Sequence, residues 1–303
     1  MMKKCNMQAS PGCRIRTRIR TLLLLALAVL AAGCSSIRLS YDYGDTLLYW
    51  WLDAYVDLDQ AQNVRVKKDI EQLFQWHRKT QLKDYAQLLK GGQHQLQGNV
   101  TEADLLADYS AVKERATLLL FRSEAELADL ARSLHPEQLL QMEQKFASQN
   151  DDYRKKYLSG DTEKHRRLHF VKSMEQFELW FGGFSREQEA ILRQASDARP
   201  LDDRIWLAEH MRRQQNIAAL LRKVQQEKLG KEATLALVHN LIKDSVDGME
   251  QSDNKAFFDA YKQGSVRLVL TAIRIATPAQ KAHARKRMQD WIDDFNALAA
   301  AAH

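Results

Sequence analysis

Few side chains in this chain of 303 residues stand at spacings that could support metal chemistry. His165 and His169 are four residues apart, so on a helix both imidazoles could reach one ion, but no Glu or Cys stands at ligand spacing beside them. Asp57 opens an Asp-x-Asp pattern typical of calcium loops. Such a loop needs Gly at its sixth position and a bidentate Glu at its twelfth, where this chain has Gln62 and Lys68. The sequence therefore predicts no metal site.

Catalytic side chains are equally hard to place. His77 could act as a base, but a histidine that is hydrogen-bonded for structural reasons is the simpler interpretation. The Gly-x-Ser-x-Gly, phosphate-loop and dinucleotide-binding patterns do not occur in the printed sequence. The paired carboxylates of a cell-wall hydrolase are assembled in space, so the 39 acidic residues do not identify a pair. We therefore expect no enzyme activity, no catalytic residue and no cofactor.

One cysteine stands where a covalent modification is expected. A basic segment ending at Arg20 precedes eleven apolar residues, 22–32, which as a helix would span roughly 16 Å, about half of a ~30 Å hydrocarbon core. This is the layout of a signal peptide. Leu30-Ala31-Ala32-Gly33-Cys34 resembles the lipobox of bacterial lipoproteins. The resemblance implies cleavage between Gly33 and Cys34 and acylation of Cys34, with palmitate among the attached chains. The alternative is an ordinary signal peptide that has a cysteine there by chance.

The excess of basic residues belongs to this N-terminal segment. Residues 1–33 hold six Lys or Arg and no acidic residue, and 45 basic residues less these six leave 39, equal to the 39 acidic residues. A neutral body argues against nucleic acid and against electrostatic attraction to anionic lipid. Lipid on Cys34 would instead hold the protein at a membrane. Asp after the cysteine marks inner-membrane retention in such lipoproteins, but Ser35 stands here, which implies the periplasmic side of the outer membrane.

Helical patterns dominate from residue 45 onward. Segments of ~20–35 residues, rich in Ala, Leu, Gln, Glu, Lys and Arg, lie between Gly or Pro positions, and no alternating β-branched run is long enough for a strand. We predict an all-α protein, an elongated bundle of about eight to ten helices. The expected divisions are a signal peptide over 1–33, a lipidated tether over 34–44 and one helical domain over 45–303. Two bundles abutting near residues 182–183 are the alternative.

An aromatic segment follows the expected tether. It contains Tyr49, Trp50, Trp51 and Tyr55, and adjacent tryptophans lie about 100° apart on a helix, so the two cannot face one side. One interpretation is a short N-terminal helix packed into the bundle. The other is that some of these rings lie at the headgroup level, or against a partner, and orient the body on the membrane. These four aromatic residues are the candidate contact residues.

Three expected helix starts share a pattern. His135, Ser185 and Thr277 each precede a Gln by three residues, which is the spacing of a capping box. Three well-capped helices are the simple interpretation. The pattern also resembles, loosely, the Leu-Thr-x-x-Gln signature of small helical periplasmic chaperones, which supplies an alternative function.

Two further stretches resemble a known family. They are Trp51-Leu52-Asp53-x-Tyr55-x-Asp57-Leu58-x-x-x-Gln62, and Trp76-His77-Arg78 followed by Leu82 and Tyr85-Ala86. Together with the lipobox they resemble the uncharacterised proteobacterial lipoproteins with domain of unknown function 6279, over about residues 30–90. The resemblance implies a location and an all-helical fold, without an activity. The candidate cluster of motif residues is Asp53, Asp57, Trp76, His77, Arg78 and Tyr85. Gln81 and Lys83 replace the family's Glu and Pro, which leaves a kink in the helix expected over 60–89 open.

These observations predict a lipid-anchored periplasmic protein that acts by contact, as an interaction or envelope-assembly component. Its expected partners are membrane lipid, through Cys34, and a periplasmic or outer-membrane protein. The alternatives are a chaperone-like client-binding protein and, more distantly, a cell-wall-active hydrolase.

Overall fold

The computed structural model describes residues 36–302, and all regular structure within that range is helical. Twelve α-helices and one short π-helix confirm the all-α prediction, and their number exceeds the expected eight to ten. In chain order the elements are α2 (Ser36–Val56), α3 (Gln60–Thr80), α4 (Leu82–Gln95), α5 (Glu102–Arg122), α6 (Glu124–Ser133), α7 (Pro136–Tyr153), η1 (Arg154–Leu158), α8 (Thr162–Phe181), α9 (Arg186–Asp197), α10 (Asp203–Gln226), α11 (Lys231–Gln251), α12 (Lys255–Ile275) and α13 (Pro278–Ala301). The predicted signal peptide, with Gly33 and Cys34, lies outside the described residues.

Helix α2 begins earlier than the sequence led us to expect. The tether was predicted to extend over residues 34–44, but the chain is helical from Ser36. The reason is burial, because Ile37 and Tyr41 pack against a core cluster that α4 and α13 form around Leu82 and Ile292. Helical structure therefore begins two residues after Cys34.

The helix predicted over residues 60–89 is divided at Gln81 into α3 and α4. The Thr80 hydroxyl donates to the Trp76 carbonyl at 2.8 Å, a local bond that competes with the helix ladder and bends helices. Beyond the break Leu82 is fully buried against α13. The sequence left open whether this helix is kinked, and the tertiary packing of Leu82 fixes the position of the break.

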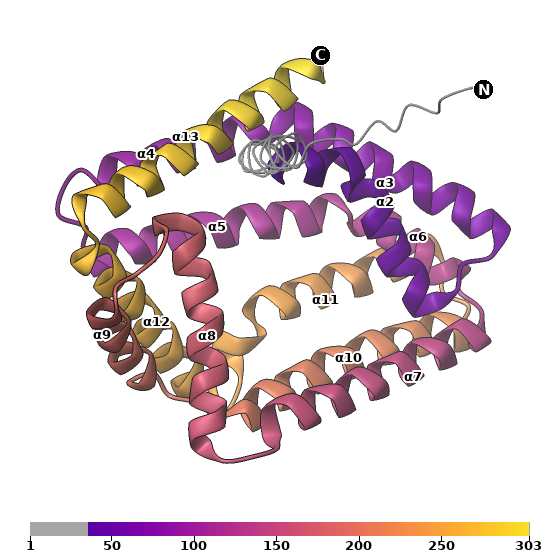
Figure 1. Ribbon diagram of the computed structural model, residues 1–303. Coiled ribbons are helices and arrows are strands. Elements are labelled where there is room, and N and C mark those ends of the chain that lie inside the picture. Colours follow the sequence, from indigo (N-terminus) through magenta and orange to yellow (C-terminus); the bar gives the residue numbers. More distant parts are fainter. Residues whose placement is uncertain (1–35, 303) are drawn as a thin grey trace, which may run out of the picture.

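The helices form two halves, α2–α7 and α8–α13, whose contacts follow the same order. Helix α7 packs on α10 of the other half, and α13 likewise packs on α4. When α2–α7 are matched in order with α8–α13, the contact between α6 and α11 corresponds to the contact between α12 and α5. In the same way, the contact between α2 and α7 corresponds to the contact between α8 and α13. Figure 1 shows α4 and α13 along one edge of the molecule and α7 and α10 along the opposite edge. The halves are therefore interlocked, with α2 and α8 in corresponding positions.

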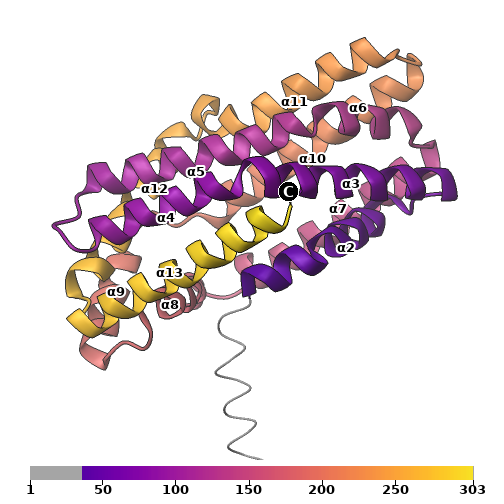
Figure 2. The same ribbon diagram turned by 90° about the horizontal axis from the view of Figure 1, so that it is seen from above.

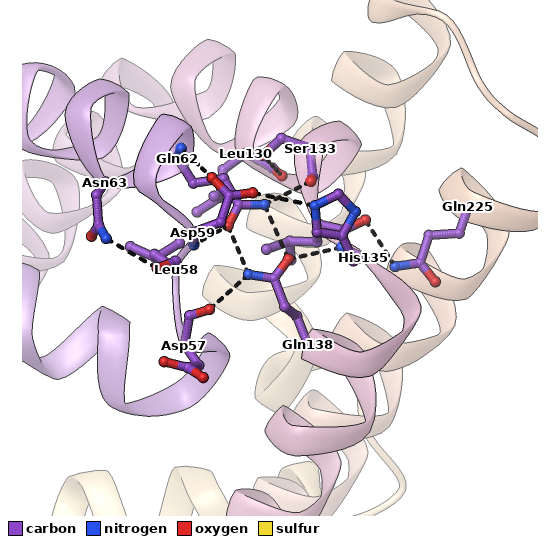
Figure 3. A network of polar contacts seen from close by, with 11 residues as sticks. Asp57, Leu58, Asp59, Gln62, Asn63, Leu130, Ser133, His135, Gln138 and Gln225 are labelled. Carbon is purple, nitrogen blue, oxygen red and sulfur yellow. Dashed lines mark hydrogen bonds and ion pairs between the residues drawn. The ribbon is translucent and has the colours of Figure 1, made fainter.

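Helices α3 and α7 meet at their N-terminal ends through two buried glutamines, Gln62 and Gln138 (Figure 3). Their amides exchange hydrogen bonds of 3.0 and 2.7 Å. Gln62 also donates to the Ser133 carbonyl and Gln138 to the Asp57 carbonyl, in each case two residues before the N-cap of the partner helix. Each amide oxygen accepts the main-chain N–H of its own N-cap residue. We call this arrangement a glutamine clasp.

Gln188 and Gln280 form a second glutamine clasp, between α9 and α13. Gln188 donates to the partner amide and to the Ile275 carbonyl, both at 2.8 Å, and Gln280 donates to the Gly183 carbonyl at 2.7 Å. Those carbonyls again lie two residues before the partner's N-cap. Three of the four clasped helix starts carry the predicted Gln pattern. The fourth, at Asp59, has the same spacing and a complete capping box, and was not predicted.

We expect Gln138→Ala to lower the free energy of unfolding by about 1–3 kcal/mol, because the substitution leaves the buried Gln62 amide and the Asp57 carbonyl without this partner. Urea-induced unfolding measures the change. The control is Gln75→Ala on the exposed face of α3, expected to change stability by no more than about 0.5 kcal/mol. Equal midpoints for the two variants would contradict a structural role for the clasp.

Candidate functional site

Helix α2 carries the predicted contact residues, and the body holds this helix near its start. The Tyr41 hydroxyl lies 2.8 Å from Nδ1 of His77, and the Arg78 guanidinium donates to the Tyr41 carbonyl. Phe74 and Tyr85 enclose the pair, with ring centroids 6.0 Å from Tyr41 and 5.3 Å from His77 respectively. The start of α2 is thereby fixed to α3 and α4.

Burial sets the protonation of this cluster. It lowers the pKa of His77 below its ordinary value of 6.5 and raises the pKa of Tyr41. Both side chains are therefore neutral near pH 7, and their contact is a neutral hydrogen bond. The cluster holds α2 without an ion pair between these two side chains.

The other end of α2 is fixed by contacts to the main chain. Asp53 Oδ1 accepts the Leu58 N–H at 2.9 Å, and Asp57 adopts a left-handed conformation with φ of 52°. The clasp residue Gln138 donates to the Asp57 carbonyl at 3.0 Å. These contacts end the helix and direct the chain into α3.

Two of the four predicted contact residues face the body. The Tyr49 hydroxyl donates to Asn63 Oδ1, and the Tyr49 ring lies 4.5 Å from Nζ of Lys67. The Tyr55 hydroxyl accepts a hydrogen bond of 2.6 Å from Gln149. Both tyrosines thus attach the second half of α2 to α3 and α7.

The motif residues that the sequence grouped into one cluster occupy two places. Trp76, His77, Arg78 and Tyr85 lie together at the start of α2, where Trp76 and His77 have ring centroids 6.0 Å apart. Asp53 and Asp57 lie at its end. Both groups therefore fix the same helix, from opposite ends.

The side of α2 that faces away from the body carries large apolar side chains. Its large exposed side chains are Leu39, Tyr43, Leu47, Trp50 and Trp51, each 56–61% exposed. At about 100° per residue these positions fall within about 120° of the helix circumference. Trp50 and Trp51 thus share one wide exposed face, and the expectation that the two cannot face one side was wrong. Figure 2 shows α2 on the outside of the bundle. We call these five residues the apolar face of α2.

Helix α8 occupies the corresponding position in the other half and has a different surface. Its large exposed apolar side chains are Val171 and Leu179, which are 45% and 36% exposed. Charged side chains predominate on its exposed positions, namely Glu163, Lys164, Arg166, Arg167, Lys172, Glu175 and Glu178. The fold therefore does not require an exposed apolar face at this position.

Leu39, Tyr43 and Leu47 are members of the apolar face that the sequence-based prediction omitted. Their spacing of four residues, continued by Trp51, is the signal of a single helix face. The signal was incomplete without the structure, because a helical stripe is usually the side that packs into the core. Only the position of the body shows that this one points outward.

The histidine pair considered for metal binding is engaged elsewhere. Nε2 of His165 lies 3.2 Å from the Ser159 carbonyl oxygen, and Nε2 of His169 lies 2.9 Å from Asp203 Oδ1. Within residues 36–302 no group of three or more His, Cys, Asp or Glu is arranged to hold a metal ion. In the same range, no helix combines the length and the apolar character needed to cross a bilayer.

Because burial lowers the folded-state pKa of His77, the unfolded chain binds this proton first as the pH falls. The contribution to stability is therefore present above the unfolded pKa of about 6.5 and lost below it. We expect His77→Gln, which keeps an acceptor for Tyr41, to lose less stability than the parent between about pH 7.5 and about pH 5.5. Urea unfolding at both pH values tests this. His210, whose pKa burial also lowers, remains in both proteins.

The exposed His283 supplies the control for this experiment. His283→Gln should keep the pH dependence of the parent. A His77→Gln profile that coincides with those of the parent and His283→Gln would show that His77 does not bring about the loss.

Comparison with curated proteins gave no match, and comparison with solved structures gave none either. One family model matches residues 54–244, which begin near the end of α2 and extend through most of α11. The match contains Trp76, His77, Arg78 and Tyr85 and reaches well beyond residue 90, where the sequence resemblance was only architectural. All five residues of the apolar face of α2 precede it. The chain belongs to a family of unknown function (DUF6279).

Proposed function

We propose that this protein is a lipoprotein anchored through Cys34 to the periplasmic side of the outer membrane, where the apolar face of α2 lies on the lipid surface. In this position the helical body acts by contact with a periplasmic or outer-membrane protein and does not catalyse a reaction. The observation that carries the proposal is the exposure of five large apolar side chains on one face of α2, directly after the predicted acylation site.

The anchor and the apolar face support each other by their spacing. Cys34 precedes the helix by two residues, so acyl chains on that cysteine would enter the membrane beside the first turn of α2. Two signals together give stable attachment where one acyl chain alone gives marginal binding. Tryptophan and tyrosine are also the side chains enriched at the boundary between hydrocarbon and water.

Burial of the exposed parts of these five side chains would contribute on the order of 5 kcal/mol to membrane contact. Such a contact orients the body only if α2 is rigid relative to it. The cluster at Tyr41 and the turn at Asp57 supply that rigidity at opposite ends of the helix. On this proposal the motif residues serve the membrane contact indirectly, by holding the helix that makes it.

We expect tryptophan fluorescence of the full chain in vesicles that contain brominated lipid to be quenched, mainly through Trp50 and Trp51. Replacing both with Phe should remove most of the quenching, because the other four tryptophans are only partly exposed. Trp180→Phe, which changes a ring packed against Trp291, is the control and should keep it. Equal quenching in the parent and in the Trp50→Phe/Trp51→Phe variant would refute the membrane contact.

Lipidation has its own test. Cells that express the full chain should incorporate labelled palmitate into it, and Cys34→Ala should abolish the labelling. Cys13→Ala, which removes a cysteine of the predicted signal peptide, should leave the labelling unchanged. Label that persists in Cys34→Ala would place the acyl chain elsewhere.

The contact role is tested by crosslinking in intact cells followed by mass spectrometry. We expect a periplasmic or outer-membrane protein to be crosslinked to the parent and lost in Leu47→Gln/Trp50→Gln, since the altered helix would no longer orient the body. Val171→Gln/Leu179→Gln on α8 is the matched control and should retain the partner. If the α2 variant were crosslinked to the same protein as the parent, partner binding would not depend on the membrane contact of α2.

One observation favours the chaperone-like alternative. A concave region of about 490 Å³ between α5, α11 and α12 is lined mainly by apolar side chains, among them the exposed Tyr109 and Val112, with charged residues such as Lys113 and Glu250 also in its wall. Surfaces of this kind mark binding sites for apolar ligands or segments. Suppression of the aggregation of an unfolded client, lost in Tyr109→Gln/Val112→Gln, would support this alternative.

A further inference from the structure

The half of the molecule that contains α8 has a cavity between α8, α10 and α12. Its volume is about 460 Å³, within the range of about 300–1,000 Å³ that is usual for ligand pockets. Its lining combines aromatic rings with cationic and imidazole groups, including Tyr157, His169, Lys172, Arg199, Trp206 and Tyr261. This composition differs from that of the apolar region beside α5.

The charged side chains in the wall of this cavity are cationic. Lys172 and Arg199 line it, and none of the described residues in its wall is Asp or Glu. The Lys172 ammonium group contacts the Tyr157 hydroxyl, and Arg199 donates to the hydroxyls of Ser173 and Ser196 at 3.1 and 2.9 Å. These partners are neutral. Asp197 raises the pKa of Arg199 through space, but its carboxylate is paired with Arg193 at 2.8 Å. A bound anion would therefore be the first negative group hydrogen-bonded to Arg199 or Lys172 within the described residues.

The surroundings of Arg199 hold its guanidinium at the cavity wall. The group lies 5.6 Å over the ring of Tyr261. Gly264 makes this approach possible, because a Cβ atom there would lie 2.9 Å from Cγ of Arg199. Burial lowers the pKa of Arg199, so its charge is partly desolvated, and an anion would relieve that cost.

The buried carboxylate of Asp203 contacts two residues of the cavity wall. Asp203 Oδ1 lies 2.9 Å from Nε2 of His169 and 3.3 Å from the Tyr153 hydroxyl. These contacts hold the imidazole and the phenol at the cavity wall. The Asp203 carboxylate is thus committed to these two side chains.

Two buried donors at the wall have no hydrogen-bond partner in the described part of the chain, namely Nε1 of Trp206 and Oγ of Ser265. Buried polar groups are nearly always hydrogen-bonded, so an unpaired pair needs an explanation. Both residues also line the apolar region between α5, α11 and α12. The same cavity wall also contains the apolar side chains of Leu268 and Val269, in addition to the cationic groups.

We propose that this cavity binds a small anionic amphiphile, with its carboxylate or phosphate between Lys172 and Arg199 and its apolar part against Trp206 and Val269. Arginine forms paired hydrogen bonds with either head group, and lysine adds a point charge. The site is separate from the apolar face of α2 and does not depend on the membrane contact proposed for it.

Isothermal titration calorimetry of the full chain in phosphatidylcholine nanodiscs tests the proposal, with empty nanodiscs as the reference. The probes are hexyl phosphate and hexanoate, with hexanol and inorganic phosphate as fragments that lack the charge or the chain. At least one of the two anionic amphiphiles should bind more tightly than either fragment. The tighter of the two identifies the preferred head group. Hexanol that binds as tightly as the anionic probes, or inorganic phosphate that binds as tightly as hexyl phosphate, would overturn the proposal.

Two variants locate the site. Lys172→Gln changes an exposed side chain and should weaken binding about tenfold or more, as should Arg199→Gln if that variant keeps its helical circular-dichroism spectrum. Arg167→Gln removes the same charge from the exposed surface of α8, outside the cavity lining, and should bind like the parent. Equal affinities for Lys172→Gln and Arg167→Gln would overturn the assignment even if Arg199→Gln does not fold.

Discussion

The two glutamine clasps are the constraint on which the rest of the structure depends. The first turn of a helix leaves main-chain groups that need partners. In each clasp the glutamine amide oxygen accepts the main-chain N–H of its own N-cap residue. The amide nitrogen donates to the opposite glutamine and to a carbonyl of the chain that leads into the partner helix. The clasped residues are far apart in sequence, as Gln62 and Gln138 are. The clasps therefore fix helices of different segments in one register, and with them α2 and α8, which lead into clasped helix starts.

Helices α2 and α8 occupy corresponding positions in the two halves but expose different side chains. The outward side of α2 carries five large apolar side chains, whereas that of α8 is mainly charged. Behind α8 lies a cavity whose described wall holds two cations and no carboxylate. One scaffold thus offers an apolar surface on one half and a charged cavity on the other. This division is consistent with a body that lies on a membrane through α2 and keeps the other half available for a ligand.

The motif residues illustrate how far sequence can predict a site. Spacing along the chain grouped Asp53 and Asp57 with His77 and Arg78, and the structure separates them. Tyr41 and Asp53 are twelve residues apart on one helix, which is about 18 Å at 1.5 Å per residue. His77 contacts the former and cannot reach the latter. Proximity in sequence identified residues with a shared task, the attachment of α2, but could not show that they act at opposite ends of it.

The sequence by itself determined the helical class, three of the four clasped helix starts and the apolar character of the segment after the predicted lipidation site. These follow from local periodicity and capping, which depend on residues three or four positions apart. Only the tertiary structure decided the interlocking of the halves, the break at Gln81, the outward direction of the apolar face and the presence of Lys172 and Arg199 in the wall of one cavity. Each of these depends on contacts between distant segments, and a periodic pattern states that a face is apolar without stating what covers it.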